Sequence, residues 1–323
     1  MRLTKNICKS RAGLLMNVSL KNKSTWKIKL SFICFLCLTS NLFAQKHLPI
    51  IDVHLHAYTI WPVQNDTAWY PSQFKRPGSN EELMRQSLAA MNKYNVVKAV
   101  ISGKPETVLK WKTSAPDRFI NGYESFEPFT AEHTERLRQR IESGEVKVLA
   151  EIITQYTGVA ASDSAMDLLY KLAEENDIPI GIHMGLGPSG IAYSTDYRSR
   201  LSNPLLLEEA LIRHPKLRLY VMHAGWPMLD EMVAMLYAFP NLYVDIAVIN
   251  WYIPKAEFYT YLKRLVDAGF SNRIMFGSDQ MQWPESIGAA IQAIDSAPFL
   301  TSQQKRDIFY NNAIRFFRID KTK

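Results

Sequence analysis

Cysteine is almost absent from this chain. The 323 residues include only Cys8, Cys34 and Cys37, and no cysteine follows residue 37. The rest of the chain therefore has no disulfide, no cysteine nucleophile and no thiolate to hold zinc. Any metal bound there must be held by His, Asp and Glu side chains.

The first 44 residues lack acidic side chains and any apolar run long enough to span a membrane. Residues 1–30 carry eight basic side chains, and residues 30–44 form a short apolar run that is about half as long as a spanning helix needs. A basic segment, a short apolar run and a final small residue are typical of a secretory signal peptide. We therefore predict that residues 1–44 are a signal peptide, with translation starting at Met1 or Met16, and that the protein is exported to the periplasm or secreted. An uncleaved membrane anchor is the alternative.

An excess of charge of either sign is missing from the remainder of the chain. The whole chain has 38 basic and 31 acidic residues, but eight basic ones lie in the leader, which leaves 30 basic against 31 acidic residues. This balance gives no support for nucleic-acid binding. We expect a small-molecule substrate, no nucleic acid and no stable membrane insertion after signal cleavage. The sequence is compatible with either a monomer or a homo-oligomer.

Short apolar runs alternate with longer amphipathic stretches beyond residue 45. Most of these runs are continuously apolar, as expected of parallel strands that are covered on both faces. The eight candidate strands are 48–55, 96–102, 118–124, 146–152, 178–184, 217–223, 242–248 and 273–279.

The stretches between these strands have helical periodicity. The candidate helices are 81–95, 131–144, 164–177, 205–215, 227–240, 256–269 and 302–317, and Gly144 is a predicted helix end. Parallel strands need helical crossovers, so the pattern predicts an α/β fold with a single (β/α)8 TIM barrel over residues 45–323. A doubly wound open sheet competes, but its usual glycine-rich loop after the first strand is missing from DVHLHAY.

Four of the seven histidines lie at the carboxyl end of a predicted strand. His54 and His56 end the first strand, His183 ends the fifth and His223 ends the sixth. Side chains two positions apart on a strand point to the same face, so His54 and His56 can both project into the barrel mouth. Because the carboxyl ends of barrel strands meet at one rim, we expect these imidazoles to converge.

Two carboxylates have similar positions. Glu151 lies near the end of the fourth strand, and Asp279 follows the eighth. Imidazoles together with a carboxylate suit Zn²⁺, with Mn²⁺ or Fe²⁺ as alternatives. Each motif alone is more often structural, but so many polar groups at one end of a core are costly unless they are paired or coordinated. The combination therefore predicts a metal site.

Five motifs follow one another along the chain: IDVHLHAY, PIGIHMG, VMHAGWP, MFGSDQMQWP and NNAIRFF. This ordered set resembles the amidohydrolase superfamily, specifically amidohydrolase family 2, over nearly all of residues 48–318. That family includes aminocarboxymuconate-semialdehyde decarboxylase, related aromatic-acid decarboxylases and lactone hydrolases. The resemblance implies a metal-dependent enzyme on a TIM barrel.

Carried over position by position, the resemblance implies that His54, His56, His183 and Asp279 are metal ligands. His223 matches a histidine that binds a second ion in relatives with two ions and polarises the substrate in relatives with one. The implied mechanism uses a water activated by the metal. Asp279 then acts as general base and later as general acid, while His223 and the metal stabilise the oxyanion.

Glu151 has two interpretations. A glutamate at the end of the fourth strand bridges two ions in some relatives, so Glu151 is a candidate ligand. The alternative is a salt bridge or a hydrogen bond to substrate. The resemblance therefore implies one or two bound ions.

Substrate contacts are expected from the loops that follow the strands. The candidates are Gln155, Tyr156, Arg198, Trp226 and Trp251. Aromatic side chains with an arginine suggest a substrate that has a ring and a carboxylate. The alternative is that these side chains only pack the loops over the barrel.

We predict hydrolysis of a lactone, ester or amide bond. The first alternative is a metal-dependent decarboxylase of an aromatic or enoic acid, which the predicted export and the presence of Glu151 disfavour. The second is a noncatalytic metal-binding or ligand-binding barrel, which the complete set with His223 and Asp279 disfavours. Fold-level kinship does not supply the substrate.

Overall fold

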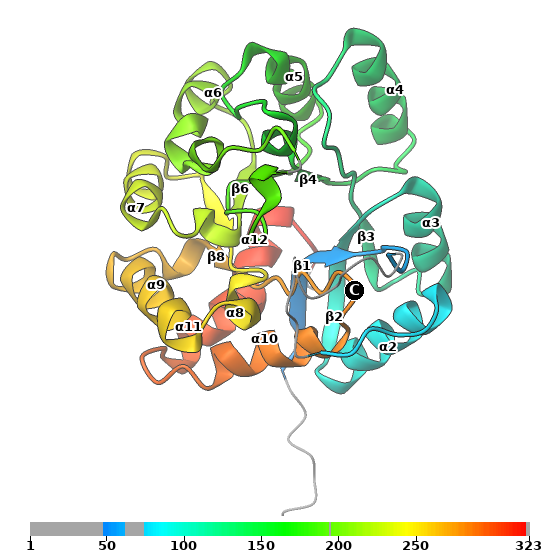
Figure 1. Cartoon of the computed structure of the whole chain (residues 1–323), viewed down its shortest axis with the longest axis vertical. Coiled ribbons are helices and arrows are strands. Elements are labelled where there is room, and N and C mark those ends of the chain that lie inside the picture. Colours follow the sequence, from blue (N-terminus) through cyan, green and yellow to red (C-terminus); the bar gives the residue numbers. More distant parts are fainter. Residues whose placement is uncertain (1–47, 62–73, 194, 321–323) are drawn as a thin grey trace, which may run out of the picture. The chain divides into compact units, whose positions relative to one another are not determined.

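Parallel strands and helices alternate along the chain in the computed structural model, which describes residues 48–61, 74–193 and 195–320 (Figure 1). The predicted signal peptide lies outside the described residues. The strands are β1 Ile50–His56, β2 Val96–Ser102, β3 Phe119–Asn121, β4 Leu149–Ile152, β5 Ile180–His183, β6 Leu219–Met222, β7 Tyr243–Asp245 and β8 Ile274–Met275. Each overlaps one of the eight predicted strands.

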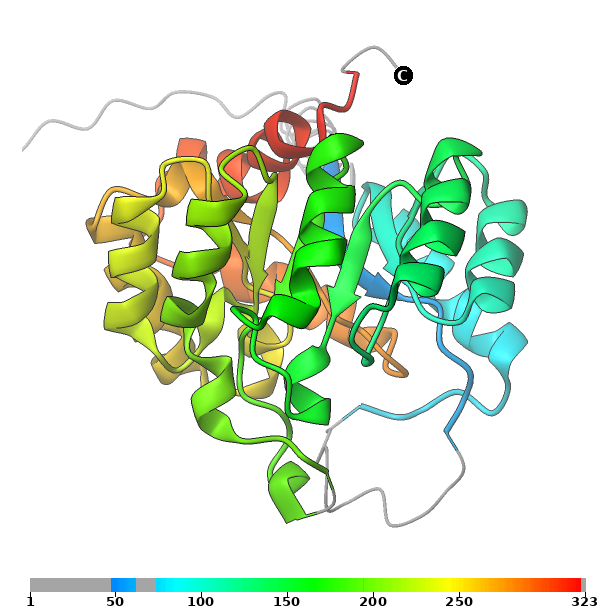
Figure 2. The same ribbon diagram turned by 90° about the horizontal axis from the view of Figure 1, so that it is seen from above.

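Helices form the outer layer around these strands (Figures 1 and 2). They are α2 Asn80–Lys93, α3 Pro105–Ser114, α4 Ala131–Glu142, α5 Asp167–Glu175, α6 Glu208–Arg213, α7 Leu229–Ala238, α8 Ile249–Tyr252, α9 Lys255–Asp267, α10 Glu285–Asp295, α11 Ser302–Arg306 and α12 Asn312–Phe317. The predicted helices are confirmed in place, and α3, α8 and α10 are additional. Within the described residues, none of the helices has the length and apolar character needed to traverse a bilayer.

The strands close into a barrel. Hydrogen-bonded neighbours run β1-β2-β3 and β4-β5-β6-β7-β8, all parallel. A bridge between Gly122 and Val148 joins the first group to the second. On the other side, the Val53 amide donates to the Phe276 carbonyl at 2.9 Å, which joins β1 to the end of β8. The (β/α)8 barrel is therefore confirmed.

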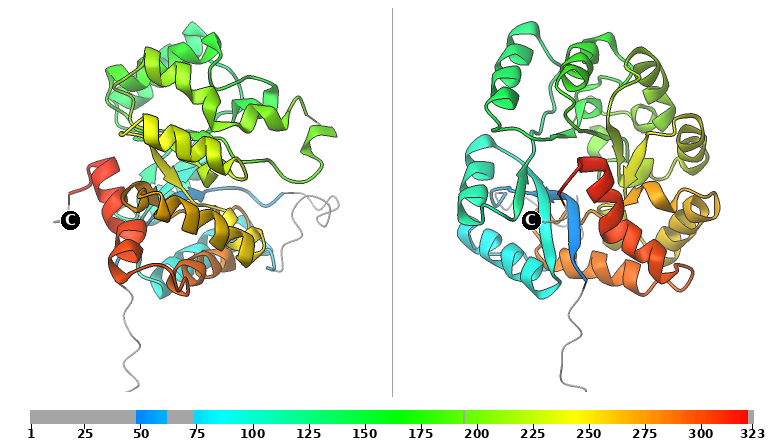
Figure 3. Two further views of the ribbon diagram at one scale, coloured as in Figure 1. Left: turned by 90° about the vertical axis from the view of Figure 1, so that its left-hand side faces the viewer. Right: turned by 180° about the vertical axis from the view of Figure 1, so that it is seen from behind.

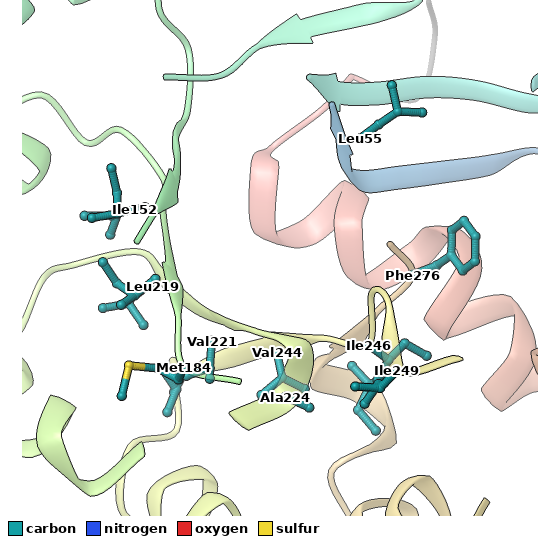
Figure 4. Packing of buried hydrophobic residues seen from close by; sticks show 14 of the residues in the cluster. Leu55, Ile152, Met184, Leu219, Val221, Ala224, Val244, Ile246, Ile249 and Phe276 are labelled. Atoms are coloured by element: carbon teal, nitrogen blue, oxygen red, sulfur yellow. The ribbon is translucent and has the colours of Figure 1, made fainter. Parts of the chain in front are cut away.

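Apolar side chains from the strands contribute to two separate cores. The larger one packs Leu55 of β1, Leu219 of β6 and Phe276, which follows β8, against the surrounding helices (Figure 4). The smaller one joins Ile51, Val53 and Tyr220 to residues of α12. Seen from behind, α12 lies across the centre of the ring (Figure 3). Burial on both sides explains why the strands have no polar face.

Strand β1 is irregular where it approaches the barrel mouth. Its pairing with β2 shifts register between Asp52 and Leu55. Within this stretch, Val53 belongs to the inner core, whereas Leu55 at its end belongs to the outer one. Such irregularities re-aim side chains, and this one leaves His54 and His56 directed into the mouth.

Local signals in the sequence explain where several helices begin and end. Ser79 accepts a hydrogen bond from the Glu82 amide before α2, and Thr130 accepts one from the His133 amide before α4. Helix α4 ends immediately before Gly144, which has a φ of 78°. A residue in that conformation just after a helix is usually glycine, so the predicted end at Gly144 is confirmed.

Candidate metal centre

Six side chains from five strand ends gather at the carboxyl end of the barrel. They are His54, His56, Glu151, His183, His223 and Asp279, and each of these residues is at most 7% exposed. These are the six residues that the sequence predicted as ligands, and the structure brings all of them together. The barrel topology does this, because every parallel strand delivers its last residue to the same rim.

The first group of donor atoms consists of the two imidazoles of β1 and the carboxylate after β8. His54 Nε2 lies 3.2 Å from His56 Nε2. Asp279 Oδ1 lies 3.1 Å from His56 Nε2 and 3.9 Å from His54 Nε2. Two nitrogens and an oxygen thus point at one small volume, as in protein zinc sites.

Glu151 lies between this group and a second one. Its Oε2 is 3.3 Å from the Nε2 atoms of both His54 and His56. Its Oε1 is hydrogen-bonded to His183 Nδ1 and lies 3.3 Å from His223 Nε2. Each carboxylate oxygen therefore faces a different pair of imidazoles.

Hydrogen bonds around the rim determine which imidazole nitrogens carry a proton. His223 Nδ1 lies 3.1 Å from the Ala247 carbonyl oxygen, which can only accept, so Nδ1 carries the hydrogen. His54 Nδ1 lies 3.0 Å from the Asp245 carboxylate in the same way. In their neutral forms these imidazoles present lone pairs on Nε2 to the centre, beside two carboxylates. A buried set made only of acceptors fits a divalent cation.

The pKa shifts at the site agree with this interpretation. Burial alone would lower the pKa of His54, but the carboxylates of Asp279, Glu151 and Asp245 raise it well above its usual value. Against the same effect of burial, hydrogen bonds to Asp279 and Glu151 raise the pKa of His56 to about 9. The carboxylates of the rim thus create a strong preference for positive charge at this point.

Asp245 in β7 holds two ligand-bearing strands together. Its Oδ2 faces His54 Nδ1, and its Oδ1 accepts the amide of His223 at 2.8 Å and that of Ala247 at 3.0 Å. Asp245 is fully buried. The sequence prediction did not include it, although it lies inside the predicted seventh strand LYVDIAV, where a lone carboxylate was a usable signal.

His56 has supports of its own. Gln280 accepts the His56 amide through Oε1 at 2.8 Å and donates through Nε2 to the His56 carbonyl at 2.6 Å. Ser102 Oγ, at the end of β2, lies 3.0 Å from His56 Nδ1. These contacts fix both the backbone and the ring of His56. Neither supporting residue was predicted, because a serine that ends a strand and a glutamine in a loop have no distinctive pattern.

One further carboxylate was also missed. Glu124 follows β3, and its Oε1 lies 3.6 Å from His56 Nδ1. The hydroxyl of Tyr58 donates to the same oxygen. The sequence did contain a pattern that could have identified it, because Glu124 is the last residue of the predicted third strand, where site residues are expected.

The predicted substrate contacts divide into two sets. The Tyr156 ring lies 5.4 Å from that of His183, and Trp226 lines a small cavity together with His223. Gln155 is buried in the loop that follows β4.

The other two candidates donate hydrogen bonds to backbone carbonyl groups. Trp251 donates its indole N–H to the Ser278 carbonyl at 2.7 Å. Arg198 is exposed, and its guanidinium donates to the Tyr197 carbonyl at 2.7 Å within its own loop.

Comparison with known proteins gives one family and many similar folds. A family model described as amidohydrolase matches residues 51–319. No curated protein matches the chain. Among solved structures, an uncharacterized TIM-barrel protein from Bordetella bronchiseptica is 19% identical, with 84% of this chain and 99% of that chain covered and a TM-score of 0.64.

Two other solved structures carry descriptions of an activity. A probable 2-pyrone-4,6-dicarboxylic acid hydrolase from Acinetobacter baumannii, with citric acid bound, is 12% identical over 84% of this chain and all of that chain, with a TM-score of 0.59. A 5-carboxyvanillate decarboxylase from Novosphingobium aromaticivorans, complexed with manganese, is 14% identical over 85% of this chain and 97% of that chain, also with a TM-score of 0.59. At such identities the likeness shows the barrel fold, and it extends to both hydrolases and decarboxylases.

Proposed function

This chain belongs to the amidohydrolase family, and on that premise we propose that it is a hydrolase that cleaves a lactone, ester or amide bond of a small substrate with an activated water. The observation that carries the proposal is the position of Glu151. Its two oxygens face two different pairs of imidazoles. A carboxylate placed in this way can bridge two cations, an arrangement that recurs in hydrolytic enzymes.

The buried donors at the rim fit a divalent cation. The side chains that would hold one or two ions are His54, His56, Glu151, His183, His223 and Asp279. A set rich in imidazole nitrogen favours Zn²⁺, with Mn²⁺ or Fe²⁺ as alternatives. When bound, a divalent cation supplies Lewis acidity, which lowers the pKa of water and polarises a carbonyl group.

The residues themselves move the protons. The Asp279 carboxylate accepts the proton of the attacking water and later delivers it to the leaving group, so it is regenerated in each turnover. In a site with one ion, His223 would act as an imidazolium that keeps its Nδ1 hydrogen on the Ala247 carbonyl and donates a second hydrogen bond from Nε2 to the oxygen of the scissile carbonyl. In a site with two ions, His223 is a ligand instead.

Metal content tests the proposal directly. We would measure metal per chain by elemental analysis in residues 45–323, before and after chelation, and in Glu151→Gln. We expect a value near two that falls toward one in the variant. A value near one that the variant leaves unchanged would make Glu151 a substrate contact and remove the main support for hydrolysis. Failure to retain zinc or manganese, even after reconstitution, would contradict a metal site.

Decarboxylation is the second candidate function. The observation in its favour is that a solved structure with this fold is a decarboxylase with bound manganese. The two reactions give different products. Release of CO₂ from aromatic and enoic acids, with no hydrolysis of lactones, esters or amides, would select the decarboxylase.

We also propose that the protein is exported. The support is the sequence of residues 1–44, with its basic segment and short apolar run. Expression of the full chain followed by cell fractionation and N-terminal sequencing tests this. We expect a mature chain that begins near residue 45 and is found outside the cytoplasm; an intact N-terminus in the cytoplasm would contradict it.

A further inference from the structure

A polar pair lies beside the six predicted ligands of the candidate metal centre. Tyr58 follows β1, Glu124 follows β3, and the tyrosine hydroxyl donates to Glu124 Oε1. The Tyr58 ring stacks on the imidazole of His56, with 4.2 Å between centroids and 23° between planes. The pair is therefore fixed directly against one of the predicted ligands.

Glu124 lies in a different position from Asp245, the carboxylate that orients His54. Asp245 is fully buried and lies 3.0 Å from the nitrogen that it holds. The Glu124 side chain is 11% exposed, and it lies 3.6 Å from His56 Nδ1, a nitrogen that Ser102 Oγ approaches at 3.0 Å. His56 is thus oriented without Glu124, which is available for another role.

Glu124 also belongs to the space where the reaction is proposed to occur. Its carboxylate, that of Glu151 and a ring nitrogen of His56 all lie within 4.8 Å of one another. The Tyr58 hydroxyl reaches the same space through its hydrogen bond to Glu124 Oε1. A substrate bound at the centre would therefore meet both members of the pair.

The pair offers hydrogen-bond acceptors to a substrate. A carboxylate only accepts, and Tyr58 uses its single hydrogen on Glu124, so its own oxygen is left as an acceptor as well. Such a surface binds O–H or N–H groups and repels a carboxylate. Specificity of this kind is strong, because a buried acceptor without a donor costs free energy.

Flat aromatic side chains extend from the same point. The Tyr58 ring lies 6.0 Å from that of Trp61, and Trp61 lies edge-on to Trp283 at 6.2 Å. Trp251 lies 6.2 Å from Trp283. Trp283 is only 3% exposed and packs beside the partly exposed Trp61. The Trp61 ring suits the carbon skeleton of a cyclic substrate, and the acceptor pair suits its polar substituent.

We propose that Tyr58 and Glu124 form a subsite that selects cyclic substrates bearing a neutral hydroxyl or an amino group next to the bond that is cleaved. This inference rests on the proposed hydrolytic function of the same site. It differs from the sequence-based expectation of a carboxylated substrate, because a carboxylate at this subsite would face Glu124.

Three matched lactones test the subsite. They are γ-butyrolactone, its 2-hydroxy derivative and its 2-amino derivative, and the reading is the ratio of kcat/KM for each substituted lactone to that for the parent. We expect a ratio of at least about 10 for one of them in the wild type, since tenfold corresponds to about 1.4 kcal/mol and a hydrogen bond to a charged carboxylate contributes on this scale. Comparison of the hydroxyl and the amine identifies the natural donor.

Substitutions in Tyr58 and Glu124 test whether this ratio of kcat/KM values depends on the pair. In Glu124→Gln we expect the ratio to fall toward one while the metal content stays unchanged, and in Tyr58→Phe we expect it to fall in the same direction. Glu127→Gln, an exposed carboxylate of the same loop, is the matched control and should keep the wild-type ratio. If Glu124→Gln lowers all three kcat/KM values together and leaves their ratio at the wild-type value, the substitution has only damaged the enzyme. That result would overturn the proposal. The proposal would also be overturned if the wild type showed no preference for either substituted lactone over the parent.

Binding of ligands that cannot be hydrolysed separates failure of the subsite from failure of the proposed function. We would compare 3-hydroxytetrahydrofuran and 3-aminotetrahydrofuran with tetrahydrofuran by saturation-transfer NMR. If no lactone is hydrolysed but a substituted ring binds more tightly in a manner that depends on Glu124, the subsite stands and hydrolysis is wrong. Equal binding of all three rings would overturn the subsite.

Discussion

Asp279 has the most demanding role at the level of single residues, because it is both a candidate ligand and the proposed proton carrier. Its backbone adopts a φ of 47°, which non-glycine residues seldom do. His223 has a φ of 57°. Both left-handed residues lie directly at the proposed reaction centre, where such conformations tend to concentrate. The sequence gives no signal for them, since neither position is a glycine.

We expect Asp279→Asn to separate binding of the metal from catalysis. The amide keeps an oxygen for the ion but cannot accept the proton of water, so turnover should fall by about 10²–10⁴-fold. Elemental analysis and initial rates measured on the same preparation check this. A noncatalytic barrel predicts the opposite pattern, namely no turnover in the wild type and no further effect of the substitution.

Asp245 supports a prediction of a different kind. Asp245→Asn keeps the shape but weakens acceptance from His54 Nδ1 and the orientation of that ring. Loss of such a contact typically lowers metal affinity by about 10–100-fold. Competition with a chelating dye measures the affinity. Unchanged affinity would show that the two rim carboxylates and the remaining imidazoles suffice to orient His54.

At the scale of elements, the strands were predictable and several helices were not. Continuous apolar runs mark all eight strands because both faces are covered. Helix α10 was missed, and its Gly288 explains why. A Cβ at that position would lie 2.5 Å from the Tyr94 hydroxyl oxygen. The glycine allows α10 to approach α2, and a requirement of tertiary packing is invisible in a local pattern.

The predicted site follows the same logic. The six ligands could be found because strand ends converge in any barrel. Their supports Ser102 and Gln280 could not be ranked from sequence, because their roles depend on atoms that only the closed ring brings within 3.0 Å. The irregularity of β1 was equally hidden. Spacing predicted that His54 and His56 share a face, and it said nothing about the change of face between Val53 and Leu55.

A glycine next to β8 leads to a prediction about the packing of strands. A Cβ on Gly277 would lie 2.8 Å from the Cβ of His54 and 2.9 Å from that of Ala247. We expect Gly277→Ala to destabilise the fold by about 1–3 kcal/mol through overpacking. It should also displace His54 and weaken metal binding.

Thermal unfolding and metal titration check this prediction. Gly78→Ala is the matched control, since a Cβ there would lie at an ordinary 3.6 Å from Oε2 of Glu82. Equal melting temperatures for the two variants would show that β8 and β1 move apart without cost.

On the scale of the whole molecule, the candidate metal centre lies where strands that are distant in sequence meet. His56 and Gln280, for example, pair across 224 positions. A ligand that binds only the folded state stabilises it by about 2.7 kcal/mol at a concentration one hundred times its dissociation constant. We expect chelation to lower the melting temperature and zinc to restore it, as calorimetry of the apo and reloaded protein would show. A melting temperature that does not respond to metal would contradict binding at the strand ends.

The helix that closes the far end of the barrel has a consequence for biosynthesis. Residues Ala313, Ile314 and Phe316 of α12 complete the inner core with side chains such as Ile51 and Tyr220, which are translated much earlier. While the chain is being translated, those early side chains lack the contacts of α12 until the last codons are read. The inner core is therefore completed only at the end of synthesis, and a stop codon before α12 would leave the strands without the helix that covers this core.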